Sequence, residues 1–282
     1  MAVGITASEG VRDLAGLLEH YPNFLLLTGA GMSTGSGIPD YRDRDGVRRG
    51  KAPVQGPDFR ASDLVRKRYW ARSMVGWPTL AQAAPNAGHR AIAELEANGK
   101  LAAIVTQNVD GLHQRAGSAN IVELHGNIHS VICVECGTEY SRGVIQSWLE
   151  EANPAVAGAM VIPAPDGDAQ LEPDCLADFR IPHCVRCSGM LKPDVVFFGD
   201  GVPRLHTEAA EQRLANADAL LVVGSSLMVY SGYRLCKIAA ECGKSIAAIN
   251  LGKTRADHLL SLKIEEPSEQ VLPLLTRLLG AT

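Results

Sequence analysis

The stretch "LLLTGAGMSTGSGIPDYR", from Leu25 to Arg42, decides the fold prediction. An apolar run, Phe24–Thr28, leads into Gly29-Ala30-Gly31, as a dinucleotide-binding turn does after its first strand. The third glycine of G-x-G-x-x-G is absent, because Thr34 stands at its position. A proline and polar residues then follow where a phosphate-binding helix normally begins. The stretch therefore predicts a nucleotide site followed by a polar, mobile segment.

Composition sets the class of protein. The 282 residues are 46% hydrophobic and 21% charged, which suits one large domain or a domain that carries a smaller one. A net charge of −4 argues against binding of nucleic acid by bulk electrostatics. No run of 18 apolar residues is present, and the acidic first twenty residues resemble neither a secretory signal nor a transit peptide. We therefore expect a cytoplasmic protein with reduced cysteines.

Short apolar segments alternate with amphipathic ones along most of the chain. Strands are predicted at Phe24–Thr28, Leu101–Thr106, Ile121–Leu124, Val195–Phe198, Ala219–Gly224 and Ser245–Asn250. Helices are predicted at Gly10–Glu19, Gly88–Asn98, Thr207–Asn216, Gly232–Cys242 and Pro267–Leu279. Continuous apolar runs indicate strands buried on both faces. The pattern predicts an α/β fold with a Rossmann-like, doubly wound parallel sheet.

Two regions interrupt this alternation and are expected to build a second, smaller domain. Residues 39–85 are expected to form a cofactor loop and a helical module, and residues 129–192 a zinc-binding module. The Rossmann-like domain is then expected to comprise residues 1–38, 86–128 and 193–282.

Four cysteines fall in two C-x-x-C pairs, "CVEC" and "CVRC". Two such turns provide a tetrahedral four-thiolate zinc site, so Cys133, Cys136, Cys184 and Cys187 are the predicted ligands. Four thiolates leave no position for water or substrate, and the zinc is therefore expected to be structural. A pair of redox motifs is the alternative. The remaining thiols, Cys175, Cys236 and Cys242, are expected to be plain buried or half-buried side chains.

Polar or glycine signatures follow five of the predicted strands. Carboxyl ends of strands form the ligand site in open α/β sheets, so these residues are expected to converge on one cleft. They are Gly29 to Ser33, Gln107, Asn108, Asp110, His125, Gly224, Ser225, Ser226, Asn250 and Gly252. Each signature alone also fits a structural turn. A dehydrogenase would carry an acidic ribose ligand about 20 residues after its glycine loop, and the chain has no strand end with Asp or Glu there.

The motifs taken together resemble one family. "GAGMSTGSGIPDYR", "TQNVDGLH", "ELHG", the cysteine pairs, "KPDVVFFGD" and "VVGSSLMVYSGYRL" stand in the order seen in sirtuins, the NAD-dependent protein deacylases. "RYWAR", "GWP" and "APDGD" resemble the class II branch, which includes a mitochondrial sirtuin of animals. Since the chain lacks a transit-peptide pattern, a bacterial cytoplasmic member is the closer expectation.

The resemblance implies a role for each matching residue. Gly29, Ala30 and Gly31 would hold the NAD pyrophosphate against the helix that follows, and residues 38–42 onward would form a closing loop. Asn108 and Asp110 resemble the residues that hold nicotinamide and its ribose. The other implied cofactor contacts are Ser33, Asp40, Tyr41, Arg42, Gln107, Gly224, Ser225, Ser226, Asn250 and Gly252.

His125 resembles the family's general base, and Asn108 is grouped with it as catalytic. In the implied mechanism the acyl-lysine oxygen displaces nicotinamide, an alkylimidate forms, and the acyl group ends on ADP-ribose. Acyl-lysine proteins or peptides are the implied substrates. Their backbone would lie between two edges, formed by Val196, Phe197, Phe198 and Gly199 and by Val229. The alternative for Val196 to Gly199 is that they form an ordinary strand of the hydrophobic core. Mono-ADP-ribosylation and a non-catalytic zinc or nucleotide-binding module remain the rival functions.

The acyl group is addressed by "RYWAR". Tyr69 and Arg72 are three residues apart, so on a helix they share a face and would bind an acidic acyl group, as in sirtuins that remove succinyl and glutaryl groups. A packed aromatic ring beside a solvated charge is the alternative. The insertion within residues 137–183 either lines the acyl channel or covers the surface.

Overall fold

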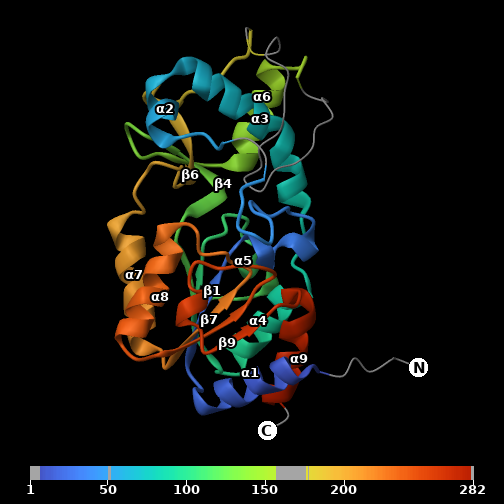
Figure 1. Cartoon of the computed structure of the whole chain (residues 1–282). Helices are drawn as coiled ribbons and strands as arrows, with labels where there is room; N and C mark the ends of the chain where they lie inside the picture. Colours follow the sequence, from blue (N-terminus) through green and yellow to red (C-terminus); the bar gives the residue numbers. More distant parts are fainter. Residues whose placement is uncertain (1–6, 50–51, 157–175, 177, 281–282) are drawn as a thin grey trace, which may run out of the picture.

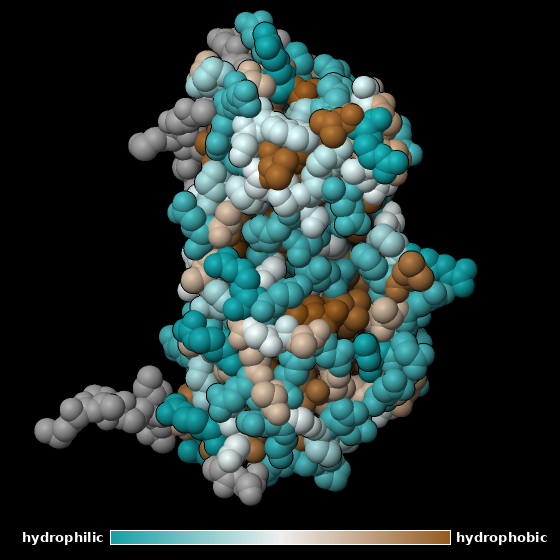
Figure 2. Space-filling model, turned by 180° about the vertical axis from the view of Figure 1, so that it is seen from behind, coloured by the Kyte–Doolittle hydropathy of each residue, from teal (hydrophilic) through white to brown (hydrophobic). Residues whose placement is uncertain are grey.

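The computed structural model describes residues 7–49, 52–156, 176 and 178–280. A larger part contains both termini of the described chain, and a smaller part lies at the opposite end (Figure 1). The residues outside these ranges include Cys175 and part of the predicted insertion within residues 137–183. The face seen in Figure 2 is mostly polar, with apolar residues in small groups.

Six parallel strands form the sheet of the larger part, in the order β3-β2-β1-β7-β8-β9. Their bounds are β1 Phe24–Thr28, β2 Leu101–Thr106, β3 Ile121–Glu123, β7 Ala219–Val223, β8 Ser245–Ile249 and β9 Leu262–Ile264. Every residue of β1 and β7 is buried, as expected for strands covered on both faces. The predicted doubly wound parallel sheet is confirmed.

Helices cover both faces of this sheet. The core on one face joins it to α1 (Glu9–His20), α4 (Ala87–Ala97) and α9 (Ser268–Gly280). The core on the other face joins it to α7 (Arg204–Asn216) and α8 (Tyr230–Glu241). The short helices α5 (Leu112–Ala116) and η4 (Asp257–Leu259) also belong to this part. Local capping sets the helix starts: Asn86 accepts hydrogen bonds from the backbone N–H groups of Gly88 and His89 at the start of α4.

The smaller part has an antiparallel sheet in the order β5-β4-β6 and three helices (Figure 1). Its elements are α2 Gly56–Ala61, α3 Asp63–Gln82, β4 Gly126–Cys133, β5 Glu139–Ser141, α6 Arg142–Ala152 and β6 Leu191–Val195. Aromatic and aliphatic side chains of α2, α3, β4 and α6 share one core, which also takes in Phe197. Both predicted insertions contribute to this part, and β4 and β6 each run across an expected domain boundary.

The predicted strand Val195–Phe198 is wrong. The strand β6 ends at Val195, where the predicted one begins, and it belongs to the smaller sheet. Beyond it, the N–H of Val196 donates to the carbonyl of His125 at 2.9 Å, and the carbonyl of Phe198 accepts from the N–H of Gly56 at 2.8 Å. The backbone of residues 196–198 therefore bonds to the segment before β4 and to the first residue of α2.

No helix among the described residues combines the length and the apolar character that crossing a membrane would require.

Candidate functional site

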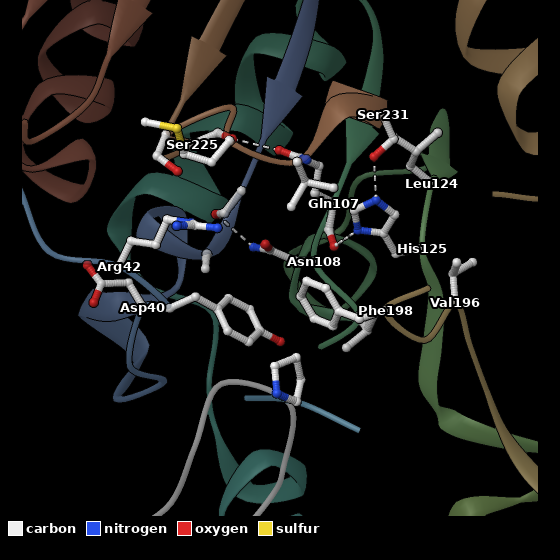
Figure 3. A pocket seen from close by; sticks show the side chains of 18 of the residues that line it. Asp40, Arg42, Gln107, Asn108, Leu124, His125, Val196, Phe198, Ser225 and Ser231 are labelled. Atoms are coloured by element: carbon white, nitrogen blue, oxygen red, sulfur yellow. Dashed lines mark hydrogen bonds between the residues drawn. The ribbon is translucent and has the colours of Figure 1, made fainter. Parts of the chain in front are cut away.

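A cavity of about 530 Å³ lies at the carboxyl ends of β1, β2, β7 and β8 (Figure 3). Since β1 lies between β2 and β7, connections leave this edge in opposite directions, and ligands bind at such a point in open α/β sheets. Most of the predicted site residues line it: Gly29, Ala30, Gly31, Ser33, Asp40, Tyr41, Arg42, Tyr69, Gln107, Asn108, Asp110, His125, Val196, Phe197, Phe198, Gly199, Gly224, Ser225, Ser226, Val229 and Asn250.

The glycine loop is held against the end of β7 by direct backbone contact. The N–H of Gly31 donates to the carbonyl of Gly224 at 2.8 Å. A Cβ on Gly224, whose φ is +60°, would lie 2.2 Å from the nitrogen of Met32. The two loops can approach this closely because neither glycine has a side chain.

The helix expected after the glycine loop is replaced by two single 3₁₀ turns, η1 (Ala30–Met32) and η2 (Thr34–Ser36). Gly37, with φ of +83°, ends the second turn and is followed by irregular chain. The expectation of a helix dipole behind the pyrophosphate is therefore wrong, since three-residue turns sum few peptide dipoles. The N–H groups of Gly29 and Gly31 donate to the carbonyls of Val223 and Gly224, so they hold the loop against the end of β7.

Asn108, Ser33 and Asp110 form a buried polar cluster at the base of the cavity. The Nδ2 group of Asn108 donates to the carbonyl of Gly29 at 3.0 Å and to the Oγ of Ser33 at 3.1 Å. The Ser33 hydroxyl in turn donates to Asp110 Oδ2 at 2.7 Å. The other carboxylate oxygen accepts from the N–H of Leu112 at 3.0 Å, at the start of α5. Each polar side chain is therefore fixed before any ligand binds.

His125 lies between a carbonyl and a hydroxyl (Figure 3). Its Nδ1 is 2.9 Å from the carbonyl oxygen of Gln107, and its Nε2 is 2.8 Å from the Oγ of Ser231. A carbonyl can only accept, so Nδ1 carries the proton and the neutral ring presents the Nε2 lone pair. Gln107 is itself held, because its Oε1 accepts from the Ser225 hydroxyl at 2.6 Å.

Burial lowers the pKa of His125 below its usual 6.5, and the hydrogen bond to the Gln107 carbonyl offsets part of this effect. Burial disfavours the imidazolium ion, whereas the carbonyl favours a protonated ring. The neutral form of the ring, which can accept a proton, therefore dominates at pH 7.

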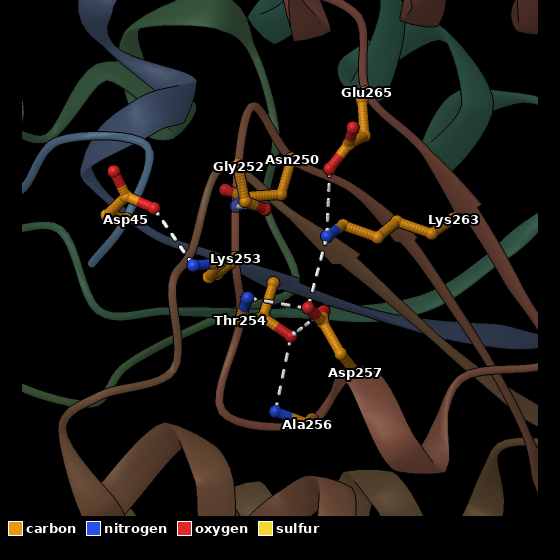
Figure 4. A network of polar contacts seen from close by, with 9 residues as sticks. All are labelled: Asp45, Asn250, Gly252, Lys253, Thr254, Ala256, Asp257, Lys263 and Glu265. Atoms are coloured by element: carbon orange, nitrogen blue, oxygen red, sulfur yellow. Dashed lines mark hydrogen bonds and ion pairs between the residues drawn. The ribbon is translucent and has the colours of Figure 1, made fainter.

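The segment from Asp40 to Arg49 closes one side of the cavity and is attached to the loop after β8. Asp43 Oδ1 accepts from the N–H groups of Asp45 and Val47, which folds the segment back on itself. The N–H of Lys253 donates to the Arg44 carbonyl at 2.8 Å, and its Nζ lies 2.9 Å from Asp45 Oδ1 (Figure 4).

Gly252 belongs to this attachment. A Cβ there would lie 2.3 Å from the Arg44 carbonyl oxygen, and its φ is +96°. Gly252 is not among the residues that line the cavity, although it was expected to contact the cofactor. A glycine is needed at position 252 because the loop after β8 packs closely against the segment that contains Arg44.

Aromatic residues form the wall opposite the glycine loop. The Phe198 ring has Tyr41 at a centroid distance of 6.4 Å and the Arg48 guanidinium 4.7 Å from its centroid. Arg42 Nη1 donates to the carbonyl of Gly46 at 2.8 Å, and Asp40 pairs with Arg49 at 3.1 Å. This wall therefore joins the segment after β1 to the segment after β6.

Of the two residues expected to bind an acidic acyl group, Tyr69 and Arg72, only Tyr69 is among the described residues that line the cavity. Tyr69 is 6% exposed, lines the cavity and packs against Phe59, Trp70 and Phe197 at centroid distances of 5.2–5.4 Å. Arg72 is half-buried on α3 and is not among the described residues that line the cavity.

The four paired cysteines lie together, with their sulfur atoms all within 4.8 Å of one another. Cys133 and Cys187 are 3.5 Å apart, and Cys136 and Cys184 are 3.6 Å apart. Each pair is followed by a residue with positive φ, Gly137 or Ser188, whose N–H donates to the carbonyl of the first cysteine. Two matching turns with four thiols fit a tetrahedral zinc ion.

This cluster is remote from the cavity. The strand β4 begins beside His125 and ends at Cys133, a length of roughly 20–25 Å at about 3.3 Å per residue. None of the four cysteines lines the cavity. The other thiols differ: Cys236 is buried as expected, but Cys242 is exposed at the end of α8.

Ser231 and Arg48 are cavity residues whose contacts the sequence did not indicate. Ser231 lies in the first turn of α8, where its hydroxyl meets a histidine 106 positions earlier in the chain. No local spacing predicts such a contact. Its place two residues after Val229, in an expected peptide-binding edge, was the only available signal.

Comparison with known proteins agrees with this geometry. The model of the Sir2 family matches residues 29–231. The chain is 50% identical to "NAD-dependent protein deacetylase 3" of Pseudomonas syringae pv. tomato, over 89% of this chain and 90% of that protein. It is 51% identical to "NAD-dependent protein deacetylase" of Bordetella bronchiseptica, over 93% and 96%.

Solved structures of this group are also similar. One described as "Structural Basis for the Mechanism and Regulation of Sir2 Enzymes" superposes with a TM-score of 0.76 at 32% identity, covering 98% of this chain and 99% of that one. A second, "Sir2-p53 peptide-NAD+", has a TM-score of 0.75 at 29% identity, covering 96% and 99%. With a family model that matches most of the chain and relatives near 50% identity, the chain belongs to the Sir2 family.

Proposed function

We propose that this protein is an NAD-dependent protein lysine deacylase in which His125 is the general base. The position of His125 carries the proposal: its Nε2 lone pair lies in the cavity that also contains the glycine loop and the cluster around Asn108. The names of the bacterial relatives support NAD-dependent deacetylation, and the solved relative with a peptide and NAD supports a peptide substrate.

NAD would lie across the carboxyl ends of β1, β2 and β7. The loop Gly29–Gly31 and the residues Gly224, Ser225 and Ser226 would lie against the pyrophosphate side, since glycines and small side chains let the backbone approach phosphate oxygens closely. Asn250, after β8, would contact the adenosine half. Asn108, Asp110 and Ser33 would hold the nicotinamide ribose, because their polar groups are fixed and buried there.

The chemistry of NAD in this reaction is that of an electrophilic ribose carbon with nicotinamide as its leaving group. His125 would remove a proton from a ribose hydroxyl at Nε2, and Ser231 would give up its hydrogen bond to that atom as the hydroxyl arrives. The carbonyl of Gln107 would then stabilise the imidazolium ion through Nδ1–H. The acyl-lysine oxygen would bond to the ribose carbon as nicotinamide leaves, and the deprotonated hydroxyl would then attack the acyl carbon. A water molecule would complete the release of the lysine amine and leave the acyl group as an ester on ADP-ribose.

The acyl-lysine peptide would lie as an added strand between Val196–Gly199 and Val229. These residues line the cavity from opposite elements, the segment after β6 and the start of α8. Tyr69 and Phe197 would contact the acyl chain. The segment Asp40–Arg49 would close over the cofactor, and its attachment through Lys253 would set where it closes.

A zinc ion would be held by Cys133, Cys136, Cys184 and Cys187 and would stabilise the smaller part. Because four thiolates complete its coordination, it would supply no catalytic water. A cytoplasmic location would suit this site, since thiols stay reduced there.

Incubation with NAD and an acetyl-lysine peptide tests the function. Release of free nicotinamide that depends on the peptide is the expected result. Accumulation of the reduced-cofactor absorbance would identify a dehydrogenase, and an ADP-ribose adduct on protein with the acyl group still on lysine would identify a transferase. Absence of all three, with zinc bound, would leave a binding module.

A further inference from the structure

Beneath the polar cluster lies a histidine that the proposed reaction does not use. His113, on α5, is 1% exposed, and its Nε2 is 2.9 Å from the Oγ1 of Thr28 at the end of β1. The Thr28 hydroxyl donates to Thr106 Oγ1, 2.8 Å away at the end of β2. That oxygen also accepts the backbone N–H of Asn108 at 3.1 Å. A continuous chain of buried hydrogen bonds therefore runs from His113 to Asn108.

The directions of these bonds are consistent. If Thr28 donates to Thr106, the Thr28 oxygen is left to accept from His113, so Nε2 carries the ring proton. Among the described residues, Nδ1 of His113 has no hydrogen-bond partner. Thr28 and Thr106 are 0% and 3% exposed, so water does not compete for their hydroxyls. The histidine donor thus fixes the orientation of both threonine hydroxyls.

The chain closes a loop that bears the polar cluster. Residues 107–111 connect β2 to α5 and contain Asn108 and Asp110. Thr106 anchors the start of this loop through the N–H of Asn108, and Asp110 anchors its end through the N–H of Leu112. His113 then ties α5 back to β1, the strand that leads into the glycine loop.

We propose that His113 is a positioning residue for the reaction. It acts through Thr28 and Thr106 to hold the backbone of Asn108, and with it the Asn108 side chain, in place for the nicotinamide-ribose half of NAD. This inference rests on the proposed function for its effect on catalysis, but its structural part is independent of it. Without the histidine donor, the Thr28 and Thr106 hydroxyls lose their fixed orientation, and the Asn108 turn loosens.

A matched pair of substitutions isolates the donor. His113→Gln keeps an N–H at the Nε2 position, whereas His113→Met has similar length and no donor. We expect kcat/KM for NAD to fall about five- to tenfold in His113→Met, the size of one lost hydrogen bond. It should stay within about twofold of wild type in His113→Gln. The KM for the acyl-peptide should change little in either variant. The proposed peptide-binding residues, Val196–Gly199 and Val229, take no part in the hydrogen bonds that link His113 to Asn108.

Thr28→Val breaks the same chain without altering α5, with Thr28→Ser as its control. The double variant His113→Met with Thr28→Val should be no worse than either single variant. If His113→Met does not fold, the Thr28 pair decides the question alone. Equal losses in the Gln and Met variants, additive losses in the double variant, or parallel changes for NAD and peptide would overturn the proposal.

Backbone hydrogen exchange separates this proposal from the proposed function. In His113→Met, the amides of residues 107–112 should exchange faster by more than any change in global stability accounts for, whether or not the protein cleaves NAD. Unchanged exchange would overturn the positioning role. Absence of nicotinamide release by the wild-type protein would instead overturn the proposed function.

Discussion

The Nε2 atom of His125 lies 2.8 Å from the hydroxyl oxygen of Ser231, while Nδ1 is held by the Gln107 carbonyl. The ring is therefore fixed in one tautomer, with its basic nitrogen facing the cavity and occupied by a hydroxyl that a substrate can replace. Ser231 reaches this position because α8 begins beside the strand ends that form the cavity.

The pH dependence of catalysis should reflect the pKa of His125. Burial lowers this pKa below 6.5, and the base acts when unprotonated. We therefore expect kcat/KM for NAD to be constant near pH 7 and to decrease only as pH falls below 6.5. An acidic limb centred above pH 7 would contradict this assignment. His125→Gln should lose roughly 10²–10⁴-fold in turnover and should lack the limb.

Two buried histidines should make the protein sensitive to acid. Burial lowers the pKa of His113 to about 3, with a smaller effect of His89. Burial likewise lowers the pKa of His89 to about 4, with Asp110 opposing and Arg90 adding to the effect. Folded-state values below the unfolded value near 6.5 mean that this stability is complete above pH 6.5 and is lost as pH falls towards the folded values.

Urea unfolding at pH 7.5 and 5.0 checks this prediction. The wild-type protein should lose roughly 2 kcal/mol more unfolding free energy between these values than His113→Gln, at about 1.4 kcal/mol for each pH unit below 6.5. The comparison cancels the titration of other groups. Equal losses in the two proteins would show that His113 is not held neutral.

Gly224 should be intolerant of any side chain. In Gly224→Ala the new Cβ would collide with the nitrogen of Met32, and in Gly243→Ala a Cβ at nearly the same φ, +66°, would meet nothing within 4 Å. Both variants bear the strain of positive φ, so their difference measures the close approach of the loops. We expect Gly224→Ala to be less stable by about 2 kcal/mol or more, judged from overpacked cores. Equal urea midpoints would refute this account.

The zinc site should support stability and not chemistry. Elemental analysis should give about one zinc for the four thiols. Cys184→Ala should release the metal and lower the thermal midpoint, whereas Cys242→Ala, at an exposed thiol, should do neither. Full thermal stability of a metal-free Cys184→Ala protein would contradict a structural role.

Much of the larger sheet could be predicted from the sequence, because buried parallel strands are continuous apolar runs. The cysteine cluster was predictable for a similar reason, since the C-x-x-C turn is itself a ligand geometry. The smaller sheet was not, because β4 is only partly buried and β5 has three residues, and the pairing of β4 with β6 depends on residues far along the chain. Ser231 and the chain through His113 depend on side chains that only tertiary structure brings together.

Arg72 illustrates the same limit. Helical spacing placed it near Tyr69, but spacing does not say which of two neighbouring side chains faces a cavity. Since Arg72 does not line the cavity, we expect Arg72→Met to change turnover of glutaryl-lysine and acetyl-lysine peptides by equal factors. A loss on the glutaryl peptide that exceeds the acetyl loss tenfold would place the guanidinium at the acyl group after all.

The account depends most on the fate of the acyl group. Mass spectrometry of one reaction mixture should find deacylated peptide, free nicotinamide and acyl-ADP-ribose in equal amounts, at a rate that collapses in His125→Gln. Deacylated peptide with free carboxylic acid and intact NAD would contradict the central claim, because the acyl group would then have passed to water without the cofactor.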